Sequence, residues 1–170
     1  MVSQQAERPE LIKKILHQVR QPEKILVKSA QYNQVSRSLT SQILCPQNTL
    51  FPNNQLTEVT GSQILDTVSQ VGYIFIGNLI IQDLSFGFLQ FEDYLLKLNS
   101  HKVNLVDLQI SFLRPILHQH TFQVEFKLSK NPVQKKSHCL IPFEFVAFQE
   151  NSRHVRKKVF TGSLVACYRF

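Results

Sequence analysis

Cysteine, tryptophan and long apolar runs are all scarce in this sequence, and each scarcity excludes a class of protein. The three cysteines, Cys45, Cys139 and Cys167, lie far apart and form no CxxC pair. They indicate reduced, buried side chains in a cytoplasmic protein rather than a disulfide framework. Tryptophan is absent and methionine occurs once, whereas 13 phenylalanines indicate a core of rigid aromatic and branched side chains.

No apolar stretch reaches the length of a membrane span. The first twenty residues carry charges throughout, so they lack the apolar segment of a signal peptide. The most apolar segment runs from Val71 to Ile81, is too short to cross a bilayer and contains Asn78. We therefore expect a soluble protein without a membrane span.

The bulk composition is that of one globular domain. The chain has 170 residues, of which 43% are hydrophobic and 18% charged, with a formal net charge of +7. We expect a flexible N-terminus over residues 1–8 and a single domain over residues 9–170. The positive charge favours an anionic partner, namely nucleic acid, a phosphorylated cofactor or an acidic carrier protein.

Apolar periodicity predicts three helices. The first begins at Pro9 and ends before Pro22, and the third is a short helix over residues 91–99. The second and longest covers residues 60–83 and is apolar nearly all round in its second half, so it should be buried. Gly72 and Gly77 weaken this helix by about 1 kcal/mol each relative to Ala, which indicates close packing against them.

Alternating patterns predict two strands before the long helix and four after its short successor. In residues 104–112 the alternation places one set of apolar side chains on a single face: Val106, Leu108, Ile110 and Phe112. A helix that is apolar all round must be enclosed by a curved sheet, and such a sheet has edges that favour dimerisation. We therefore predict an α+β fold in which a curved antiparallel sheet wraps one long buried helix, with an extra N-terminal helix.

Two stretches resemble the β-hydroxyacyl-carrier-protein dehydratases, which have the hotdog fold. In the run FPNNQLTEVTGSQILDTVSQVG, matching places are taken by Gly61, Ile64, Asp66, Gln70 and Gly72. A later strand begins near a basic-Pro pair, Arg114 and Pro115, as in those enzymes. The His that serves them as general base is replaced by Leu50, and their helix Glu by Asp66. Dehydration therefore lacks one of its two acid/base groups.

Over residues 10–168 the sequence more closely resembles the FcoT-type long-chain fatty acyl-CoA thioesterases, which are also hotdog proteins. The shared features are the opening helix, an AQY at residues 30–32 and a helix with Glu92, Asp93 and Tyr94. The polar cleft residues of that family fall here on different side chains: Val19, Phe51 or Pro52, Thr60 and Ser69. The resemblance implies hydrolysis of an acyl-CoA or acyl-carrier-protein thioester by a dimer or a dimer of dimers. Coenzyme A or phosphopantetheine would enter only as part of the substrate.

The long helix carries a polar stripe formed by Gln63, Asp66, Gln70 and Tyr73. As a catalytic row, Asp66 orients water as a general base while Gln63 or Thr60 holds the carbonyl. As a structural row, the same side chains form a polar seam paired across a dimer interface. A buried, unpaired Asp would have a raised pKa.

The start of this helix is the candidate binding site for the thioester. Gly61 and Ser62 would offer backbone N–H groups to the thioester oxygen, whereas Thr60 and Gln63 also fit a simple capping box. Further residues are predicted to contact the substrate: Ser69, Tyr73, Phe51 and Arg114. The acyl tail is expected between the helix and the sheet.

Basic residues near the last strand are the candidate phosphate or carrier contacts. The cluster comprises Arg153, Arg156, Lys157 and Lys158, and its alternative is a solvated edge strand guarded by charge. No exposed aromatic residues interleave with these charges, so nucleic acid is not expected as a partner. His118 and His120 have a metal-compatible spacing, but no further ligands complete a site, and no metal is predicted. The alternative to a hydrolase is a non-catalytic acyl-thioester-binding or partner subunit, or a dehydratase-like protein without its His.

Overall fold

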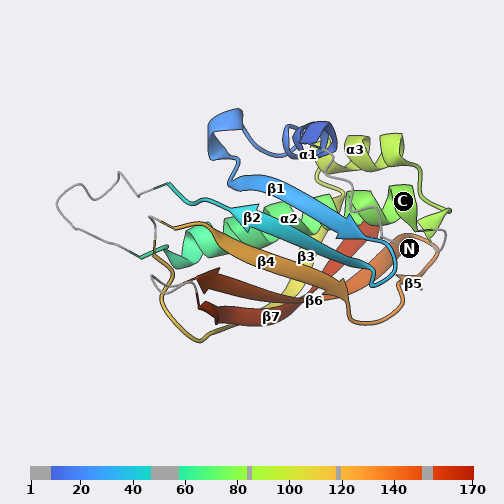
Figure 1. Ribbon diagram of the computed structural model, residues 1–170. Coiled ribbons are helices and arrows are strands. Elements are labelled where there is room, and N and C mark those ends of the chain that lie inside the picture. The colour runs from blue at the N-terminus through green and yellow to red at the C-terminus, as the bar shows by residue number, and fades with distance from the viewer. Residues whose placement is uncertain (1–8, 47–57, 84–85, 118–119, 151–154) are drawn as a thin grey trace.

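The computed structural model describes residues 9–46, 58–83, 86–117, 120–150 and 155–170. Figure 1 shows one curved sheet wrapped along a single long helix, with two shorter helices packed against the side of that helix that the sheet leaves uncovered. The helices are α1 (Pro9–Leu16), the 3-10 turn η1 (Pro22–Lys24), α2 (Gly61–Gln82) and α3 (Phe91–Asn99). The strands are β1 (Val27–Asn33), β2 (Ser38–Ile43), β3 (Val103–Phe112), β4 (Phe122–Leu128), β5 (Val133–Gln134), β6 (His138–Glu150) and β7 (Arg156–Arg169).

Helix α2 is the centre of the molecule. Unlike the shorter stretch from Val71 to Ile81, the whole helix is long and apolar enough to cross a membrane, which corrects the expectation from the sequence. However, 72% of its most apolar window is buried inside the fold. From Gly72 to Ile80 every residue except the half-buried Tyr73 is buried. This helix is therefore the core helix of a globular domain, as its nearly continuous apolar surface predicts.

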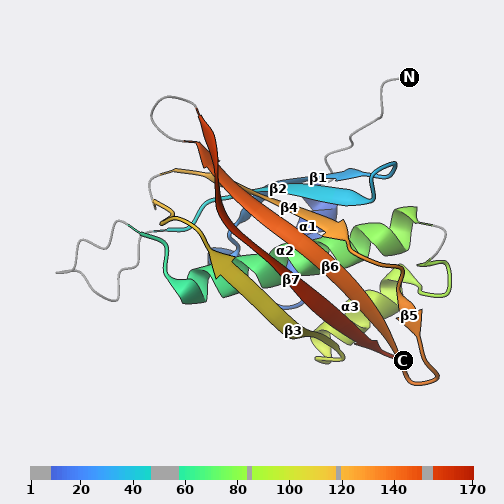
Figure 2. The same cartoon turned by 90° about the horizontal axis from the view of Figure 1, so that it is seen from below.

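The sheet is antiparallel, with the strand order β1-β2-β4-β6-β7-β3, and β5 pairs only with β6. Along β4, Phe122, Val124, Phe126 and Leu128 are buried, while the alternating polar residues face outward. Strand β6 alternates in the same way, so the concave face of the sheet is apolar and encloses α2. Figure 2 shows β3 at one edge of the sheet, beside β7.

The other side of α2 is covered by α1 and α3. A Cβ atom added to Gly77 would lie 2.5 Å from Ile15 Cδ1, so α1 approaches closely because Gly77 has no side chain. The Tyr94 hydroxyl of α3 donates a hydrogen bond of 2.6 Å to the Tyr73 carbonyl oxygen. The close packing predicted from the helix glycines is present at Gly77, whereas at Gly72 the nearest atoms would lie at 3.8 Å, an ordinary contact distance.

The interior between α2 and the sheet is filled with aromatic rings. The ring of Phe75 lies 5.3 Å from that of Phe143 and 6.1 Å from those of Phe126 and Tyr32. All four side chains are at most 3% exposed. The predicted position of the acyl tail, between helix and sheet, is therefore occupied by side chains of the protein itself along this half of α2.

Strand β3 departs from the predicted alternation. Its register with β7 shifts between Val106 and Gln109, and Asp107 has a φ of 51°. Val106 consequently pairs with Val165 on the outer face, whereas Ile110 pairs with Gly162, which lies opposite the inward-facing Phe145. The prediction that Val106 shares a face with Ile110 and Phe112 is wrong, because this β-bulge inserts an extra residue.

The bulge depends on a glycine in the neighbouring strand. A Cβ atom added to Gly162 would lie 2.1 Å from the Gln109 carbonyl oxygen and 2.5 Å from the Phe145 ring. Only a residue without a side chain permits this approach of the β3 backbone. Gly162 therefore allows the edge strand to change face while it remains hydrogen-bonded to β7.

Candidate functional site

The N-terminus of α2 is fixed by a capping box. Thr60 is the N-cap, its Oγ1 accepts from the Gln63 backbone N–H, and the Gln63 side chain accepts from the Thr60 backbone N–H at 3.0 Å. Gln63 Nε2 also donates to the Pro46 carbonyl oxygen at 2.9 Å. Thr60 and Gln63 were predicted to hold a substrate carbonyl, but both side chains are used in hydrogen bonds to nearby parts of the chain.

Backbone N–H groups remain at the same helix end. Gly61 and Ser62 are exposed, and their N–H groups donate no hydrogen bond within the described part of the chain. The first N–H groups of a helix have no partner within the helix and carry the positive end of its dipole. Of the groups predicted to contact a thioester oxygen, these two amides are the ones still free to do so.

Asp66 lies one turn further along α2 and is paired with Arg20. The guanidinium Nε and Nη2 donate to Asp66 Oδ1 at 2.8 and 2.6 Å, and Nη1 donates to the Val19 carbonyl oxygen. Both side chains are about one third exposed, with 31% and 30% accessible area. The carboxylate is therefore held by a cation yet remains within reach of water.

Gln70 joins this pair to the chain that precedes β1. It is fully buried, its Oε1 accepts from the Leu26 backbone N–H at 2.9 Å, and its Nε2 donates to the Lys24 carbonyl oxygen at 2.9 Å. The same Nε2 lies 3.3 Å from Asp66 Oδ2. Asp66 and Gln70 are thus paired with the N-terminal segment of their own chain.

Tyr73 is the remaining member of the polar row, and Ser69 is the residue before Gln70 in α2. Tyr73 is half-buried, and burial raises the pKa of its hydroxyl, while Arg20 lowers this pKa and Asp66 raises it. Ser69 donates its hydroxyl to the Leu65 carbonyl oxygen at 2.9 Å. Tyr73 therefore lies within the electrostatic reach of the Arg20–Asp66 pair and stays protonated at neutral pH.

A half-buried apolar strip borders this polar row. It consists of Leu65 on α2, which is 47% exposed, and three side chains on β3 that pack at the margin of the core: Leu105, Leu108 and Ile110. The Leu105 side chain lies beside Gly72, which places β3 against this side of α2. Apolar and polar side chains thus run in parallel along the exposed side of the helix.

The predicted basic cluster divides between two faces. Arg156 forms an ion pair with Glu125 and lies over the Phe148 ring, 3.8 Å from its centroid, on the outer face of the sheet. Lys158 is exposed and pairs in register with Phe148, on the same face. Lys157 instead lines a pocket together with Arg114. Alternation along β7 therefore separates Arg156 and Lys158 from Lys157, so these side chains do not form one continuous cluster.

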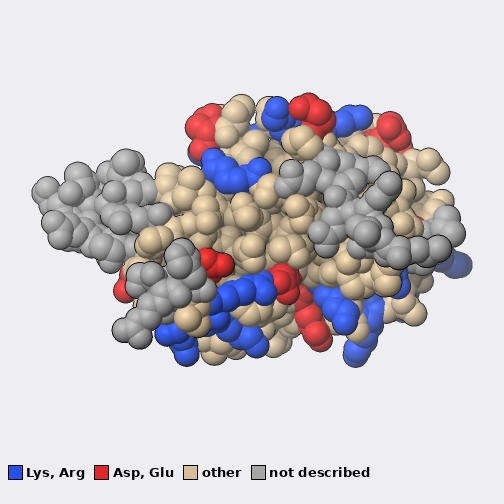
Figure 3. All heavy atoms as spheres, in the orientation of Figure 1, with Lys and Arg blue, Asp and Glu red and all other residues tan. Residues whose placement is uncertain are grey.

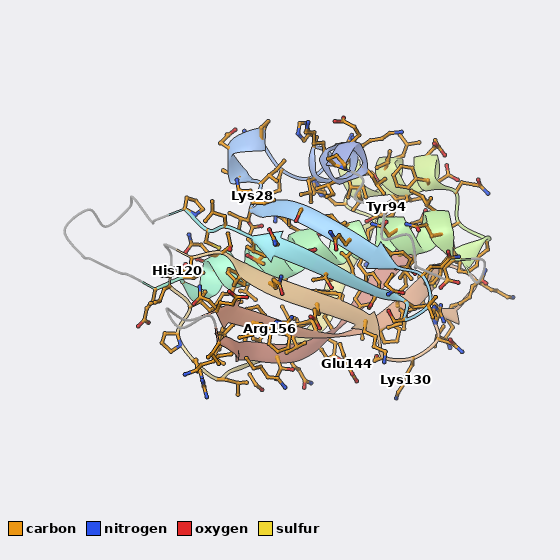
Figure 4. The ribbon with its side chains drawn as sticks, in the orientation of Figure 1. Lys28, Tyr94, His120, Lys130, Glu144 and Arg156 are labelled. Atoms are coloured by element: carbon orange, nitrogen blue, oxygen red, sulfur yellow. The ribbon has the colours of Figure 1, made fainter. Side chains whose placement is uncertain are left out.

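The pocket that Arg114 and Lys157 share has a volume of about 380 Å³. Figure 4 shows His120, another lining residue, at the end of the molecule where α2 begins. The Val59 backbone N–H donates to the Ile116 carbonyl oxygen at 2.7 Å, so the chain beside the pocket adjoins the residues that lead into α2. This pocket and the exposed side of α2 are the two parts of the candidate site.

Metal ligation finds no support in the described residues. No group of three or more His, Cys, Asp or Glu side chains within them could hold a metal ion. His118, Phe51 and Arg153, which the sequence singled out, lie outside the described residues. Arg20 was not predicted as a site residue, because 46 residues separate it from Asp66 and its own surroundings carry no motif.

Comparison with known proteins places the fold. No protein-family model matches this sequence, and no curated protein does. Among solved structures, thioesterase superfamily member 2 from Mus musculus has 14% identity and a TM-score of 0.57, covering 93% of this chain and 92% of that chain.

Two further solved structures are complexes with coenzyme A thioesters. A variant of 4-hydroxybenzoyl-CoA thioesterase with 4-hydroxybenzoyl-CoA has 9% identity and a TM-score of 0.54, covering 79% of this chain and 91% of that chain. An acyl-CoA hydrolase from Staphylococcus aureus with butyryl-CoA, CoA and CoA disulfide has 9% identity and a TM-score of 0.52, covering 79% and 67%. The chain therefore has the hotdog fold predicted from its sequence, with a short additional helix at its N-terminus.

Proposed function

We propose that this protein hydrolyses fatty acyl thioesters of coenzyme A. The observation that carries the proposal is the partly exposed Asp66 carboxylate, one helical turn after the backbone amides of Gly61 and Ser62, which donate no hydrogen bond to the described residues. A carboxylate that can activate water beside N–H donors for an oxyanion is the minimum set for thioester hydrolysis. Two of the solved structures named above are an acyl-CoA hydrolase and a 4-hydroxybenzoyl-CoA thioesterase, which supports coenzyme A thioesters as the substrate class.

The proposed reaction uses only groups of this chain. The Asp66 carboxylate removes a proton from a water molecule as its oxygen attacks the thioester carbonyl carbon. The resulting oxyanion accepts hydrogen bonds from the Gly61 and Ser62 N–H groups at the positive end of the helix dipole. The carbon–sulfur bond then breaks, the proton on Asp66 passes to the departing thiolate, and the fatty acid and coenzyme A are released.

In this proposal the two oxygens of the Asp66 carboxylate have different roles, because Arg20 contacts only one of them. Its two donors both contact Oδ1, whereas Oδ2 has only the longer contact of 3.3 Å from Gln70. Oδ2 is therefore the oxygen available to a water molecule. Because Arg20 and Gln70 are anchored to backbone carbonyls, they also fix the direction in which this oxygen points.

The acyl tail has a different proposed position from the one the sequence suggested. The helix–sheet interior around Phe75 is filled, whereas the strip of Leu65, Leu105, Leu108 and Ile110 is half-buried and adjoins Asp66. We place a long acyl chain along this strip. A series of acyl-CoA substrates of increasing length tests the placement, because kcat/KM should rise with each added pair of methylenes until the strip is covered.

Two copies of the chain are proposed to enclose this strip. Strand β3 is an edge strand, its unpaired backbone groups face outward, and Val106 and Phe112 are 41% and 59% exposed. An open edge with exposed apolar side chains favours pairing with a second sheet. Light scattering measures the mass in solution: a monomer contradicts the proposal, and twice the dimer mass indicates a dimer of dimers.

A cytoplasmic location is part of the same proposal. Cys45, Cys139 and Cys167 are all free thiols in the structure, in keeping with a reducing compartment. Fractionation of cells that produce the protein with a C-terminal epitope tests this, and recovery in a membrane pellet or an exported fraction contradicts it.

One observation favours a second candidate, a non-catalytic subunit that binds acyl thioesters. The Asp66 carboxylate already has a cationic partner, because Arg20 donates two hydrogen bonds to its Oδ1. In that case the Arg20–Asp66–Gln70 group serves only to attach the N-terminal segment to α2. The two candidates share the fold and differ in turnover.

A direct assay separates them. Purified protein is mixed with palmitoyl-CoA and a thiol-detecting reagent, and a sample without substrate corrects for the cysteines of the protein. Asp66→Asn keeps the shape of the side chain and should reduce kcat by about 100-fold or more, whereas Glu144→Asn, at an exposed position on β6, should not. Full turnover by Asp66→Asn would contradict the proposed role of Asp66. Tight binding of palmitoyl-CoA without thiol release supports the non-catalytic subunit.

A further inference from the structure

We propose that the pocket between Arg114 and Lys157 binds the nucleotide end of coenzyme A, so that the protein selects free CoA thioesters over carrier-protein thioesters. This inference rests on the proposed thioester hydrolysis. It adds the residues that distinguish coenzyme A from a carrier protein, which the polar row on α2 does not provide. The argument depends on where the two cations are held, on the walls between them and on the position of the pocket relative to α2.

The two cations are brought together by the junction of β3 with β7. The backbone N–H groups of Leu113 and Arg114 both donate to the Val159 carbonyl oxygen, at 2.9 and 3.1 Å. This double contact fixes Arg114 beside the strand that carries Lys157 two residues earlier. A guanidinium and an ammonium at one pocket provide several charged donors for phosphate oxygens.

Next to Lys157, a wall of the pocket is held by the buried amide of its register partner on β6. Gln149 is 8% exposed, its Oε1 accepts from the Leu117 N–H at 3.1 Å, and its Nε2 donates to the carbonyl oxygens of Leu117 and His120 at 3.1 and 3.3 Å. These bonds position His120, whose imidazole also lines the pocket. The hydrogen bonds of Gln149 therefore fix the backbone of this wall of the pocket.

Charge and shape together favour a nucleotide over a simple anion. Pro115, Leu117 and Val159 supply apolar wall, which suits the face of an adenine ring. Glu150 also lines the pocket, so the two cations leave a net charge near +1, enough to favour phosphates without a large excess of positive charge. The volume of about 380 Å³ lies in the range of about 300–1,000 Å³ that is common for small-ligand pockets.

The pocket also lies close enough to the start of α2 for the thioester end of a bound substrate to reach that helix. Leu117 forms an isolated bridge with Glu58, and the next residue, Val59, bonds to Ile116, immediately before the N-cap Thr60. A ligand with its nucleotide in the pocket can therefore extend its flexible pantetheine arm across this ribbon toward Gly61. Carrier-bound substrates have the arm but no adenosine, and so they leave the pocket empty.

The test compares substrates that share an acyl group and differ in the nucleotide. Decanoyl-CoA, decanoyl-dephospho-CoA, decanoyl-pantetheine and a decanoyl carrier protein are assayed with the wild-type protein and an Arg114→Gln/Lys157→Gln variant. The wild-type KM for decanoyl-CoA should lie about tenfold below that for decanoyl-pantetheine, and the double variant should remove this difference while kcat is retained. Lys130→Gln, an exposed cation at the opposite end of the molecule from His120 (Figure 4), is the control for the loss of a remote positive charge.

Failure of this inference is distinguishable from failure of the hydrolase proposal. If the wild-type protein hydrolyses all four substrates with equal KM, or if the double variant keeps the low KM for decanoyl-CoA, the pocket assignment is wrong and hydrolysis stands. If no substrate is hydrolysed, titration calorimetry with adenosine 3′,5′-bisphosphate still tests the pocket. Binding that the double variant weakens about tenfold and Lys130→Gln does not weaken supports the assignment, and absence of binding overturns it.

Discussion

Two glycines in α2 give a sharp test of how the core is packed. Replacing Gly by Ala within a helix should favour the helix by about 1 kcal/mol at either position. At Gly72 the new Cβ would lie 3.8 Å from Leu105 and Phe126, an ordinary contact distance. Gly72→Ala should therefore raise the free energy of unfolding by about 1 kcal/mol, or about 2–4 °C in Tm for a domain of this size.

Gly77→Ala should have the opposite effect, although the helix gains the same propensity. Its Cβ would lie 2.5 Å from Ile15 Cδ1 and 3.4 Å from Tyr94 Cε1, and Ile15 is fully buried. Overpacking of this kind costs about 1–3 kcal/mol, which outweighs the gain in propensity. We expect a net loss of about 1 kcal/mol, measured by urea denaturation followed by circular dichroism.

A second substitution identifies the cause of the loss. Ile15→Val removes Cδ1, the atom that Gly77→Ala would meet, so its usual cost of about 0.5–1.5 kcal/mol should shrink or vanish in the Gly77→Ala background. The packing argument fails if Gly77→Ala is as stable as Gly72→Ala. It also fails if Ile15→Val costs the same with Gly and with Ala at position 77.

Three further perturbations test other parts of the structure. Gly162→Ala would place Cβ 2.1 Å from the Gln109 carbonyl oxygen, a backbone atom that cannot move alone, so β3 should detach in part. We expect a loss of about 3 kcal/mol or more in the free energy of unfolding. Faster amide exchange should be confined to β3 and β7. Thr60→Ala removes the N-cap of α2 and should cost about 1 kcal/mol, while Thr60→Ser should cost little in the same denaturation assay. Burial, with a smaller contribution from Asp83, raises the pKa of Tyr32 to about 12. The stability that this raised pKa provides is fully present below pH 10 and is lost as the pH rises toward 12. Tyr32→Phe removes a buried hydroxyl that has no hydrogen-bond partner within the described residues, and it should become more stable relative to wild type at each step from pH 9 to 12; parallel curves would refute the assignment.

The core helices and strands were predictable because residues close together in the sequence determine each of them. Residues 60–83 combine a cap, an apolar surface all round and no proline, and the helix found there is Gly61–Gln82. The short helix Phe91–Asn99 has the bounds that its amphipathic pattern predicts. Alternation likewise located β4, β6 and β7 to within a few residues, since each has one buried and one exposed face.

The candidate site was predictable only in part, because its contacts join distant segments. Periodicity alone put Asp66 and Tyr73 on one side of a helix. That Asp66 has Arg20 as a partner depends on how α1 packs on α2, and no local pattern encodes that packing. Similarly, a run of basic residues does not reveal that Lys157 lines a pocket with Arg114 while its neighbour Lys158 faces away.

The change of face within β3 also governs how the molecule can associate. A straight edge strand offers a continuous row of donors and acceptors on which further chains can add without limit. Here the irregularity at Asp107 divides that row into two short segments with different orientations, so an incoming strand can match only one of them at a time. The divided edge therefore disfavours open-ended fibre growth.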